Sequence, residues 1–211
     1  MPTKIKICGI TCLEDAVCAI DTGADALGFV FSPHSPRYIS TTRAKAIIQK
    51  LPPFVSIFGL CVNADSGSVK QVIKTGVSIL QFHGDEPLHF CRQFDFPFIK
   101  AVRVTSKEDI EKAALDYPSA RAILLDSFDP GIYGGSGKRF DWSLIPRVLA
   151  KKVIIAGGLT PDSVDSLLSQ VRPLAVDVSS GVEAEKGVKS QQKMQAFCKA
   201  VRRFDRQNEV D

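Results

Sequence analysis

The side chains of this chain that could do chemistry stand where apolar runs end. A thiol, two guanidinium groups, an amide, an imidazole and a carboxyl occupy such places: Cys8, Arg37, Gln81, His83, Arg103 and Asp126. Asp126 closes an apolar run, and a buried carboxyl is costly without a partner, so we predict a site residue there. Asp177 also interrupts such a run, and either a site role or a structural role fits it. For His83, a positioning or structural role is favoured over direct acid–base catalysis.

Metal and cofactor chemistry finds little support in the residue pattern. The six cysteines include no C-x-x-C pair, and the three histidines form no ligand cluster at zinc spacing. We therefore expect reduced thiols that are mostly small buried apolar residues. We also expect no metal and no cofactor.

Two glycine loops near the C-terminal end form the strongest local pattern. They are Ala156–Thr160 and Ser179–Glu183, each directly after an apolar run. Their backbone amides, with a short helix starting at Gly181, would hold a phosphate; the amides meant are those of Gly157, Gly158, Ser180 and Gly181. Two tight turns with helix-capping glycines are the alternative. We predict a phosphate site because both loops stand where barrel enzymes carry one.

The glycine-rich stretch Gly134–Lys138 matches neither the P-loop motif nor the G-x-S-x-G motif of hydrolases. Ile132 and Arg139 break the P-loop pattern, and Lys138 stands where G-x-S-x-G needs its last glycine after Ser136. The segment Ser127–Phe140 is better interpreted as a mobile loop that closes over a ligand.

Eight apolar, β-branched runs would carry these side chains, each followed by a helical pattern. The runs are Ile5–Cys8, Ala26–Phe31, Val55–Cys61, Ser78–Phe82, Phe98–Arg103, Ala122–Asp126, Val153–Ala156 and Leu174–Val178. Continuous apolar runs are typical of buried parallel strands, and a repeat of roughly 26 residues suits strand–helix units. Eight such units predict a minimal (β/α)8 TIM barrel. An open doubly wound sheet is the alternative, although no G-x-G-x-x-G follows the first run.

Three predicted helix starts fit this alternation of strands and helices. Thr11–Glu14 and Ser106–Asp109 are predicted capping boxes, and Thr160-Pro161 would place proline at the first helical position. On this phasing Cys8 points into the mouth of the barrel, whereas Cys12 lies in the first helical turn and packs or faces solvent.

The composition and length of the chain limit the classes of protein to which it can belong. The chain has 211 residues, 45% of them hydrophobic and 24% charged, and a net charge of +4 without a strong basic cluster. We expect one globular domain over residues 1–211, with no nucleic-acid partner. No apolar stretch reaches the roughly 18 residues of a membrane span, and no signal peptide is evident, so we expect a cytoplasmic protein without a membrane partner.

Several motifs, in order and nearly over the whole chain, resemble phosphoribosylanthranilate isomerase of tryptophan biosynthesis. They are Lys6–Thr11, Gly28–Phe31 with Ser35–Tyr38, Gln81–Glu86, Leu125-Asp126 with Gly134–Lys138 and Phe140–Trp142, Ala156–Leu159, and Val176–Glu183. Jointly they are specific, whereas each alone is weak. Departures are mild: Ser136, Phe82 and Thr160 replace a Thr, a Leu and an Asn, and Ala184–Ser190 lacks an expected Pro and Asp.

The resemblance implies roles and a reaction. Cys8 corresponds to the general base, Asp126 to the general acid, and Arg37 to the arginine that holds the anthranilate carboxylate. Gln81, His83 and Arg103 are expected to bind substrate. The implied reaction is an Amadori rearrangement of N-(5-phosphoribosyl)anthranilate to 1-(2-carboxyphenylamino)-1-deoxyribulose 5-phosphate, which needs one acid and one base. The only partner implied is this small phosphosugar, with the chain acting as a monomer or homodimer.

Two alternatives to this enzyme fit part of the pattern. Another phosphosugar barrel, such as a ribulose-phosphate epimerase or a histidine-pathway isomerase, would share the phosphate loops but use paired acids or metal ligands. A non-catalytic phosphate-binding module would keep the loops and lose the acid and base.

Overall fold

Each of the eight predicted apolar runs forms a strand of one closed, parallel barrel. The structure is a computed structural model that describes residues 2–127 and 140–208. The strands pair in chain order, with β8 closing on β1: β1 (Lys4–Cys8), β2 (Ala26–Val30), β3 (Ser56–Cys61), β4 (Ile79–Phe82), β5 (Phe98–Val104), β6 (Ile123–Ser127), β7 (Val153–Ile155) and β8 (Ala175–Val178). The predicted TIM barrel is confirmed.

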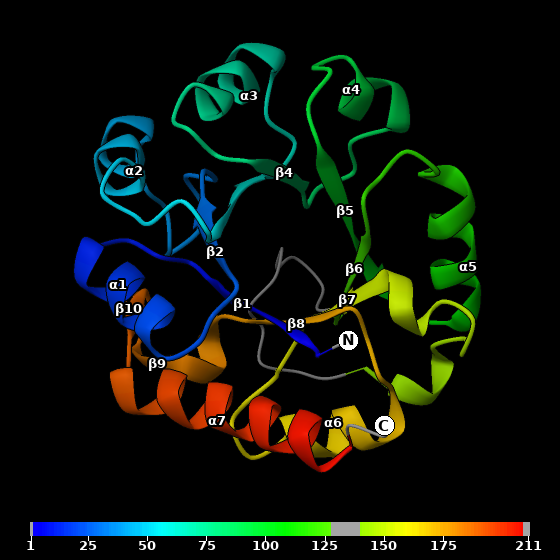
Figure 1. The fold of residues 1–211 in the computed structure, drawn as a ribbon. Coiled ribbons are helices and arrows are strands. Elements are labelled where there is room, and N and C mark those ends of the chain that lie inside the picture. Colours follow the sequence, from blue (N-terminus) through cyan, green and yellow to red (C-terminus); the bar gives the residue numbers. More distant parts are fainter. Residues whose placement is uncertain (1, 128–139, 209–211) are drawn as a thin grey trace.

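Helices form a ring around these strands (Figure 1). They are α1 (Leu13–Asp21), α2 (Thr41–Ile48), α3 (Ser66–Ile73), α4 (Leu88–Arg92), α5 (Lys107–Asp116), α6 (Val164–Gln170) and α7 (Gln191–Gln207). Two 3-10 helices, η1 (Trp142–Leu144) and η2 (Ala150–Lys152), lead into β7. After β8 come a third, η3 (Ser180–Val182), and a hairpin of β9 (Glu183–Glu185) and β10 (Val188–Lys189).

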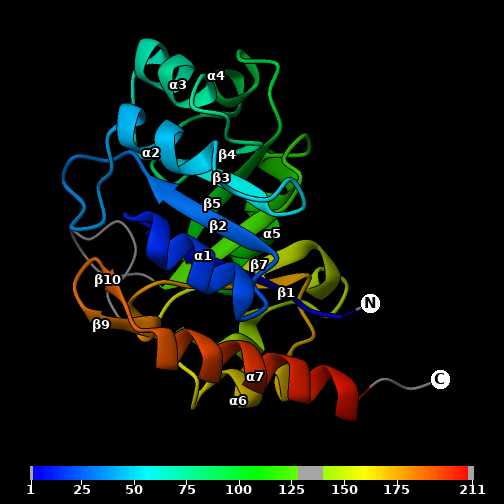
Figure 2. The same cartoon turned by 60° about the vertical axis from the view of Figure 1, so that its left-hand side comes forward.

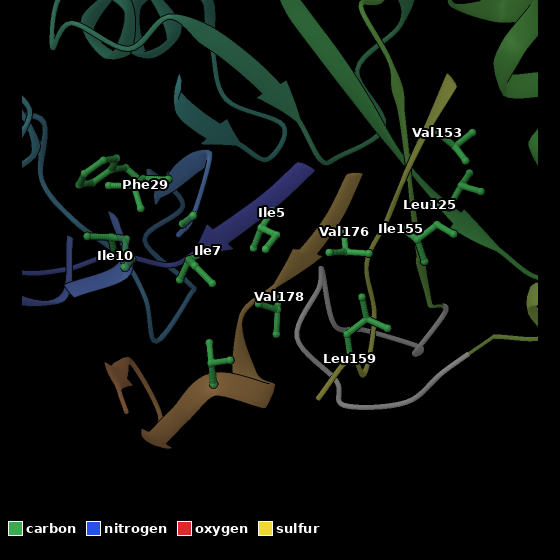
Figure 3. Close-up of a cluster of buried hydrophobic side chains, with 14 of the residues drawn as sticks. Ile5, Ile7, Ile10, Phe29, Leu125, Val153, Ile155, Leu159, Val176 and Val178 are labelled. Carbon is green, nitrogen blue, oxygen red and sulfur yellow. The ribbon is translucent and has the colours of Figure 1, made fainter. Parts of the chain in front are cut away.

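Side chains alternate between two apolar layers along every strand. Ile5 and Ile7 of β1 lie beside Val176 and Val178 of β8 in the outer layer, which the helices cover (Figure 3). The inner layer fills the barrel with residues such as Ile99, Leu124 and Ile154. By the same alternation, Lys6 and Cys8 of β1 point inward, toward the barrel axis and its mouth.

The carboxyl ends of the strands open on the side of the β9–β10 hairpin, and both termini lie toward the opposite end of the barrel (Figure 2). Polar side chains at the strand ends therefore meet at one mouth. The glycine-rich Gly134–Lys138 and most of the predicted mobile loop Ser127–Phe140 lie outside the described residues.

One of the three predicted helix starts is correct. The capping box of Ser106 and Asp109 is present at α5. The one predicted at Thr11 is wrong, because the Thr11 hydroxyl donates to the Gly187 carbonyl of the hairpin and α1 has Cys12 at its N-cap without a side-chain cap. The start at Pro161 is also wrong: residues 161–163 form a turn, and α6 begins at Val164.

All six cysteines are free thiols, as expected. Cys8, Cys61, Cys91 and Cys198 are buried, whereas Cys12 and Cys18 are half-buried. In the parts of the chain that the structure describes, no helix is long and apolar enough to cross a membrane.

Candidate active site

A cavity of about 510 Å³ opens at the mouth of the barrel, and most of the predicted site residues line it. The predicted residues on its wall are Cys8, Arg37, Gln81, His83, Asp126, Gly157, Gly158 and Ser180. They come from strand ends and loops spread over most of the chain, so only barrel closure brings them together. Cys12 is not on this wall: it is the half-buried N-cap residue of α1, one position before the first helical turn in which it was predicted.

Two predicted residues lie beside the cavity and not on its wall. Arg103 pairs in register with Asp126, but its Nη2 lies 3.7 Å from Asp85 Oδ1, and it lines a neighbouring depression over β5 and α5. Gly181 has another reason to be glycine: a Cβ there would come 1.8 Å from the Leu159 carbonyl oxygen. The missing side chain lets the two glycine loops touch, and the predicted short helix is the 3-10 turn η3 starting one residue earlier.

Cys8 ends β1 directly above a buried ion pair. The Lys6 Nζ lies 3.0 Å from Asp177 Oδ1, and both side chains are almost fully buried inside the barrel. Opposite Cys8, Gly28 of β2 leaves space that a Cβ would fill, 2.7 Å from Cys8 Sγ and 3.1 Å from Lys6 Nζ. The thiol and the ammonium group thus share one small space above the apolar layer.

The ionisation of Cys8 reflects two opposed effects. Burial raises the pKa of the Cys8 thiol, and the charges of Lys6 and Lys189 lower it without cancelling the rise. The pKa is therefore above its ordinary value in the free protein. A base at this position needs its cationic neighbours, since an unperturbed thiol near pKa 8.5 is only a few per cent thiolate at neutral pH.

Arg37 is held by a carboxylate that the sequence analysis did not single out. Its Nε and Nη2 donate to the two oxygens of Glu183 at 2.6 and 2.8 Å, a bidentate pair. Lys189 of β10 shares the same carboxylate at 3.0 Å. Hydrogen bonds from Arg37 to Glu183 raise the pKa of the guanidinium group further. Two cations around one carboxylate leave this side of the cavity suited to an anionic group.

Asp126 lies on the cavity wall in a network of hydrogen bonds. Its Oδ1 accepts from the Ser127 amide at 2.9 Å, and its Oδ2 lies 3.1 Å from His83 Nε2. The His83 Nδ1 lies 2.9 Å from Gln81 Nε2. With the Gln81 amide donating, Nδ1 accepts and Nε2 carries the hydrogen that meets Asp126. The contacts of His83 thus fit the positioning role that the sequence favoured.

Gly157, in the loop Ala156–Thr160, occupies a position where the backbone angle and the close packing both require glycine. Its φ of +81° lies in the left-handed region, and a Cβ would come within 2.8 Å of Asp126 Oδ1 and 2.7 Å of the Ser127 amide nitrogen. The backbone of this loop therefore packs directly against the carboxyl group. One loop thus serves both the predicted phosphate site and the surroundings of Asp126.

Sequence reasoning missed three charged residues of the buried ion pairs beside this cavity: Lys6, Glu183 and Lys189. A signal for Lys6 was present, because a charge between Ile5 and Ile7 needs a buried partner by the same argument that selected Asp126. For Glu183 and Lys189 the sequence carries no comparable signal, since both follow the last strand in polar loop sequence.

A closed parallel barrel with a thiol and a carboxyl across one mouth, and glycine loops after its last two strands, defines a (β/α)8-barrel enzyme with acid–base groups. Known proteins agree. The family model described as N-(5'phosphoribosyl)anthranilate (PRA) isomerase matches residues 5–200. The chain belongs to this family, and its activity is that isomerisation in tryptophan biosynthesis.

Individual relatives cover nearly the whole chain. An N-(5'-phosphoribosyl)anthranilate isomerase of Azotobacter vinelandii is 52% identical over 200 residues, which are 94% of this chain and 97% of the relative. The crystal structure of phosphoribosyl anthranilate isomerase from Thermotoga maritima has a TM-score of 0.87 at 43% identity, covering 95% of this chain and 98% of that one. A further isomerase structure contains reduced 1-(o-carboxyphenylamino)-1-deoxyribulose 5-phosphate, with a TM-score of 0.83, 41% identity and the same coverage.

Proposed function

We propose that residues 1–211 form one isomerase domain that rearranges N-(5-phosphoribosyl)anthranilate by general acid–base catalysis, with Asp126 as the acid and Cys8 as the base. The observation that carries this is that both groups line one cavity, Cys8 from the end of β1 and Asp126 from β6. An aldose-to-ketose rearrangement needs one proton delivered and another removed, and two groups of different chemistry divide that work.

Asp126 acts first in this mechanism. In its neutral form it donates a proton to the ring oxygen of the furanose as the bond from that oxygen to C1 breaks. The nitrogen lone pair then forms the C1–N double bond of a Schiff base. The His83 Nε2 and the Ser127 amide hold the carboxyl group in one orientation, which favours delivery to a fixed point in the cavity.

Cys8 acts second. Its thiolate removes the proton on C2, the C–H electrons form the C1–C2 double bond, and the C1–N electrons return to nitrogen. The resulting enolamine becomes the ketone when the O2 proton is lost and C1 gains one. The protonated Schiff base draws electrons from C2, so a thiolate of ordinary basicity suffices.

The two ends of the substrate are assigned to two anion-binding regions. We place the phosphate at the amides of Gly157, Gly158, Ser180 and Gly181, where two glycine turns and η3 meet. Arg37 is assigned the anthranilate carboxylate, with Glu183 fixing its guanidinium group. Gln81 and His83 act through Asp126. Arg103 is assigned a weaker substrate contact than Arg37, because it lines the adjacent depression and not the wall of the cavity.

The working form of the enzyme is a monomer or a homodimer in the cytoplasm. A related solved structure is described as monomers generated from a dimeric phosphoribosylanthranilate isomerase, which supports considering both states for this chain. Light scattering of the purified chain decides between them, and fractionation of the cells decides the compartment.

One assay tests the proposal. The purified chain should convert fluorescent phosphoribosylanthranilate to product in the presence of a chelator and without any added cofactor. Cys8→Ala and Asp126→Asn should each abolish most of this turnover, whereas Cys12→Ala should keep it. Full activity of either of the first two variants would remove that residue from the mechanism.

A further inference from the structure

A buried ion pair lies directly below the proposed base and takes no part in the mechanism above. Lys6 of β1 and Asp177 of β8 are register partners, 3.0 Å apart at Nζ and Oδ1, with side chains 3% and 7% exposed. Apolar inward residues such as Ile99, Leu124 and Ile154 fill the barrel around and below this pair. A buried ion pair is a weak source of stability, because apolar residues of similar volume often do as well or better. Stability alone therefore gives little reason for this pair.

The direction of the Lys6 side chain suggests a functional reason for this ion pair. Its ammonium group reaches upward into the space above Gly28, where the Cys8 Sγ also lies. A Cβ at position 28 would come 2.7 Å from the sulfur and 3.1 Å from the ammonium group, so glycine there leaves room for both groups in one space. Lys6 also lies over the ring of Phe58, 5.3 Å from Nζ to the ring centre, which restricts its other directions.

We propose that Lys6 and Asp177 are positioning residues for Cys8: Lys6 holds a positive charge against Sγ that favours the thiolate, and Asp177 fixes that ammonium group and moderates its effect. This inference rests on the proposed role of Cys8 as the base. It explains why a thiol can serve as base in a buried place, where the loss of water otherwise keeps it neutral.

The charges around Cys8 come from several elements, and Lys6 is the one on its own strand. Asp177 faces it from β8, Lys189 from β10 and Arg37 from the loop after β2, and Glu183 of β9 pairs with both of these cations. Burial lowers the pKa of Lys6, but Asp177 and Cys8 together more than offset this and the pKa is raised overall, so the group stays charged. Lys189 pairs mainly with Glu183, which leaves Lys6 as the main partner of the thiolate.

The two members of the pair act on Cys8 in opposite directions. Lys6 lowers the pKa of the thiol and Asp177 raises it, with Lys6 the larger effect. Lys6→Met should therefore raise the titration midpoint of Cys8 by about one pH unit or more, a tenfold or larger loss of thiolate near pH 7. Asp177→Asn should lower the midpoint. The double variant should fall between the wild type and Lys6→Met.

The test is a difference titration of the thiolate absorbance near 240 nm. Each protein is compared with the same protein carrying Cys8→Ser, so that the tyrosines and the other five cysteines cancel. Lys4→Met is the matched control, since Lys4 is on the same strand and pairs with Asp25 at 2.9 Å far below the mouth. It should leave the midpoint unchanged. The rising limb of the pH profile of kcat/KM should move with the midpoint in every variant.

Unchanged midpoints in folded Lys6→Met and Asp177→Asn, or shifts in the same direction, would overturn the inference. Circular dichroism checks folding, and if Lys6→Met does not fold, Asp177→Asn alone must still lower the midpoint. The base role itself is judged separately. Shifted midpoints together with normal turnover of Cys8→Ser would reject Cys8 as the base, whereas an inactive Cys8→Ser with unshifted midpoints would reject only the ion pair.

Discussion

The two walls of the cavity hold their reactive groups by different means. On the wall of β1 and β8, Cys8 lies among full charges: Lys6 below it, Asp177 beside that lysine, and Lys189 nearby. On the wall of β4 and β6, the contacts that the structure describes for Asp126 are hydrogen bonds from a backbone amide and an imidazole. One wall is built from ion pairs and the other from oriented dipoles.

This difference corresponds to the opposite tasks of the two groups. A base must be stabilised in its charged form, and buried cations do that for a thiolate. An acid must carry its proton until the substrate arrives, and a strong cation against Asp126 would drive that proton off. Keeping Lys6 and Lys189 on the thiol's side of the barrel allows an acid and a base to work in one small cavity.

Asp126→Asn should have the largest effect of any single substitution in the cavity. The amide keeps the size and shape of the carboxyl group but cannot deliver its proton, so kcat should fall toward the upper end of about 10²–10⁴-fold while KM stays nearly constant. Steady-state kinetics measure both constants. His83→Asn is the control, because a lost positioning bond should cost only about tenfold. A change of KM alone in Asp126→Asn would mean that this wall binds and does not catalyse.

Cys8→Ala tests the charged wall. Removal of the base should lower kcat by about 10²–10⁴-fold with little change in the unfolding temperature. Because burial raises the pKa of Cys8 in the wild type, kcat/KM should rise as the pH increases above 7. That rising limb should be lost in the alanine variant. If Cys12→Ala has the larger effect, the base belongs at that position instead.

Arg37→Ala should separate binding from chemistry. It removes a charge-assisted bond to the substrate carboxylate worth roughly 1.5–3 kcal/mol, so KM should rise about 10- to 150-fold with kcat nearly kept. Titration with a product analogue lacking the carboxylate provides the control, since its affinity should hardly change. A variant that loses turnover at normal affinity would place Arg37 among the proton-transfer groups.

Glu183→Gln should give the smallest effect, on stability. Burial raises the pKa of Glu183, but Arg37 and Lys189 outweigh it and the pKa is lowered overall. A lowered carboxyl pKa stabilises the fold above the unfolded value of about 4.3, and that stability is lost as the pH falls through the folded value. The variant should be about 1–2 kcal/mol less stable at pH 7, and this deficit should be smaller near pH 3, below the unfolded pKa. Denaturant unfolding at both pH values measures this, and an equal deficit at both would contradict it.

The strands and the place of the site were predictable because their signals are local. Continuous apolar runs specify buried parallel strands, and a polar residue that ends such a run must lie at the mouth once the barrel closes. Helix starts were less predictable, since the Thr11 hydroxyl can bond its own helix or the Gly187 carbonyl, and only the tertiary structure decides between them.

The direction of Arg103 and the bond between Arg37 and Glu183 were likewise beyond the sequence. Each depends on where a distant residue lies: Asp85 for Arg103, and a carboxylate 146 positions along the chain for Arg37. Lys6 was within reach of the sequence, because the cost of burying an unpaired charge applies to a lysine inside a strand as it does to the carboxyl group of Asp126.

A crystal structure of this chain with reduced 1-(o-carboxyphenylamino)-1-deoxyribulose 5-phosphate tests the central claim most directly, the division of acid and base between two walls. The phosphate should lie between the loops at Gly157-Gly158 and Ser180-Gly181, and the carboxylate at Arg37. The sugar C2 should then face Cys8 Sγ, and the C4 oxygen should face Asp126. A ligand whose C2 lies nearer to Asp126 than to Cys8, or whose phosphate lies away from both glycine loops, would contradict the account.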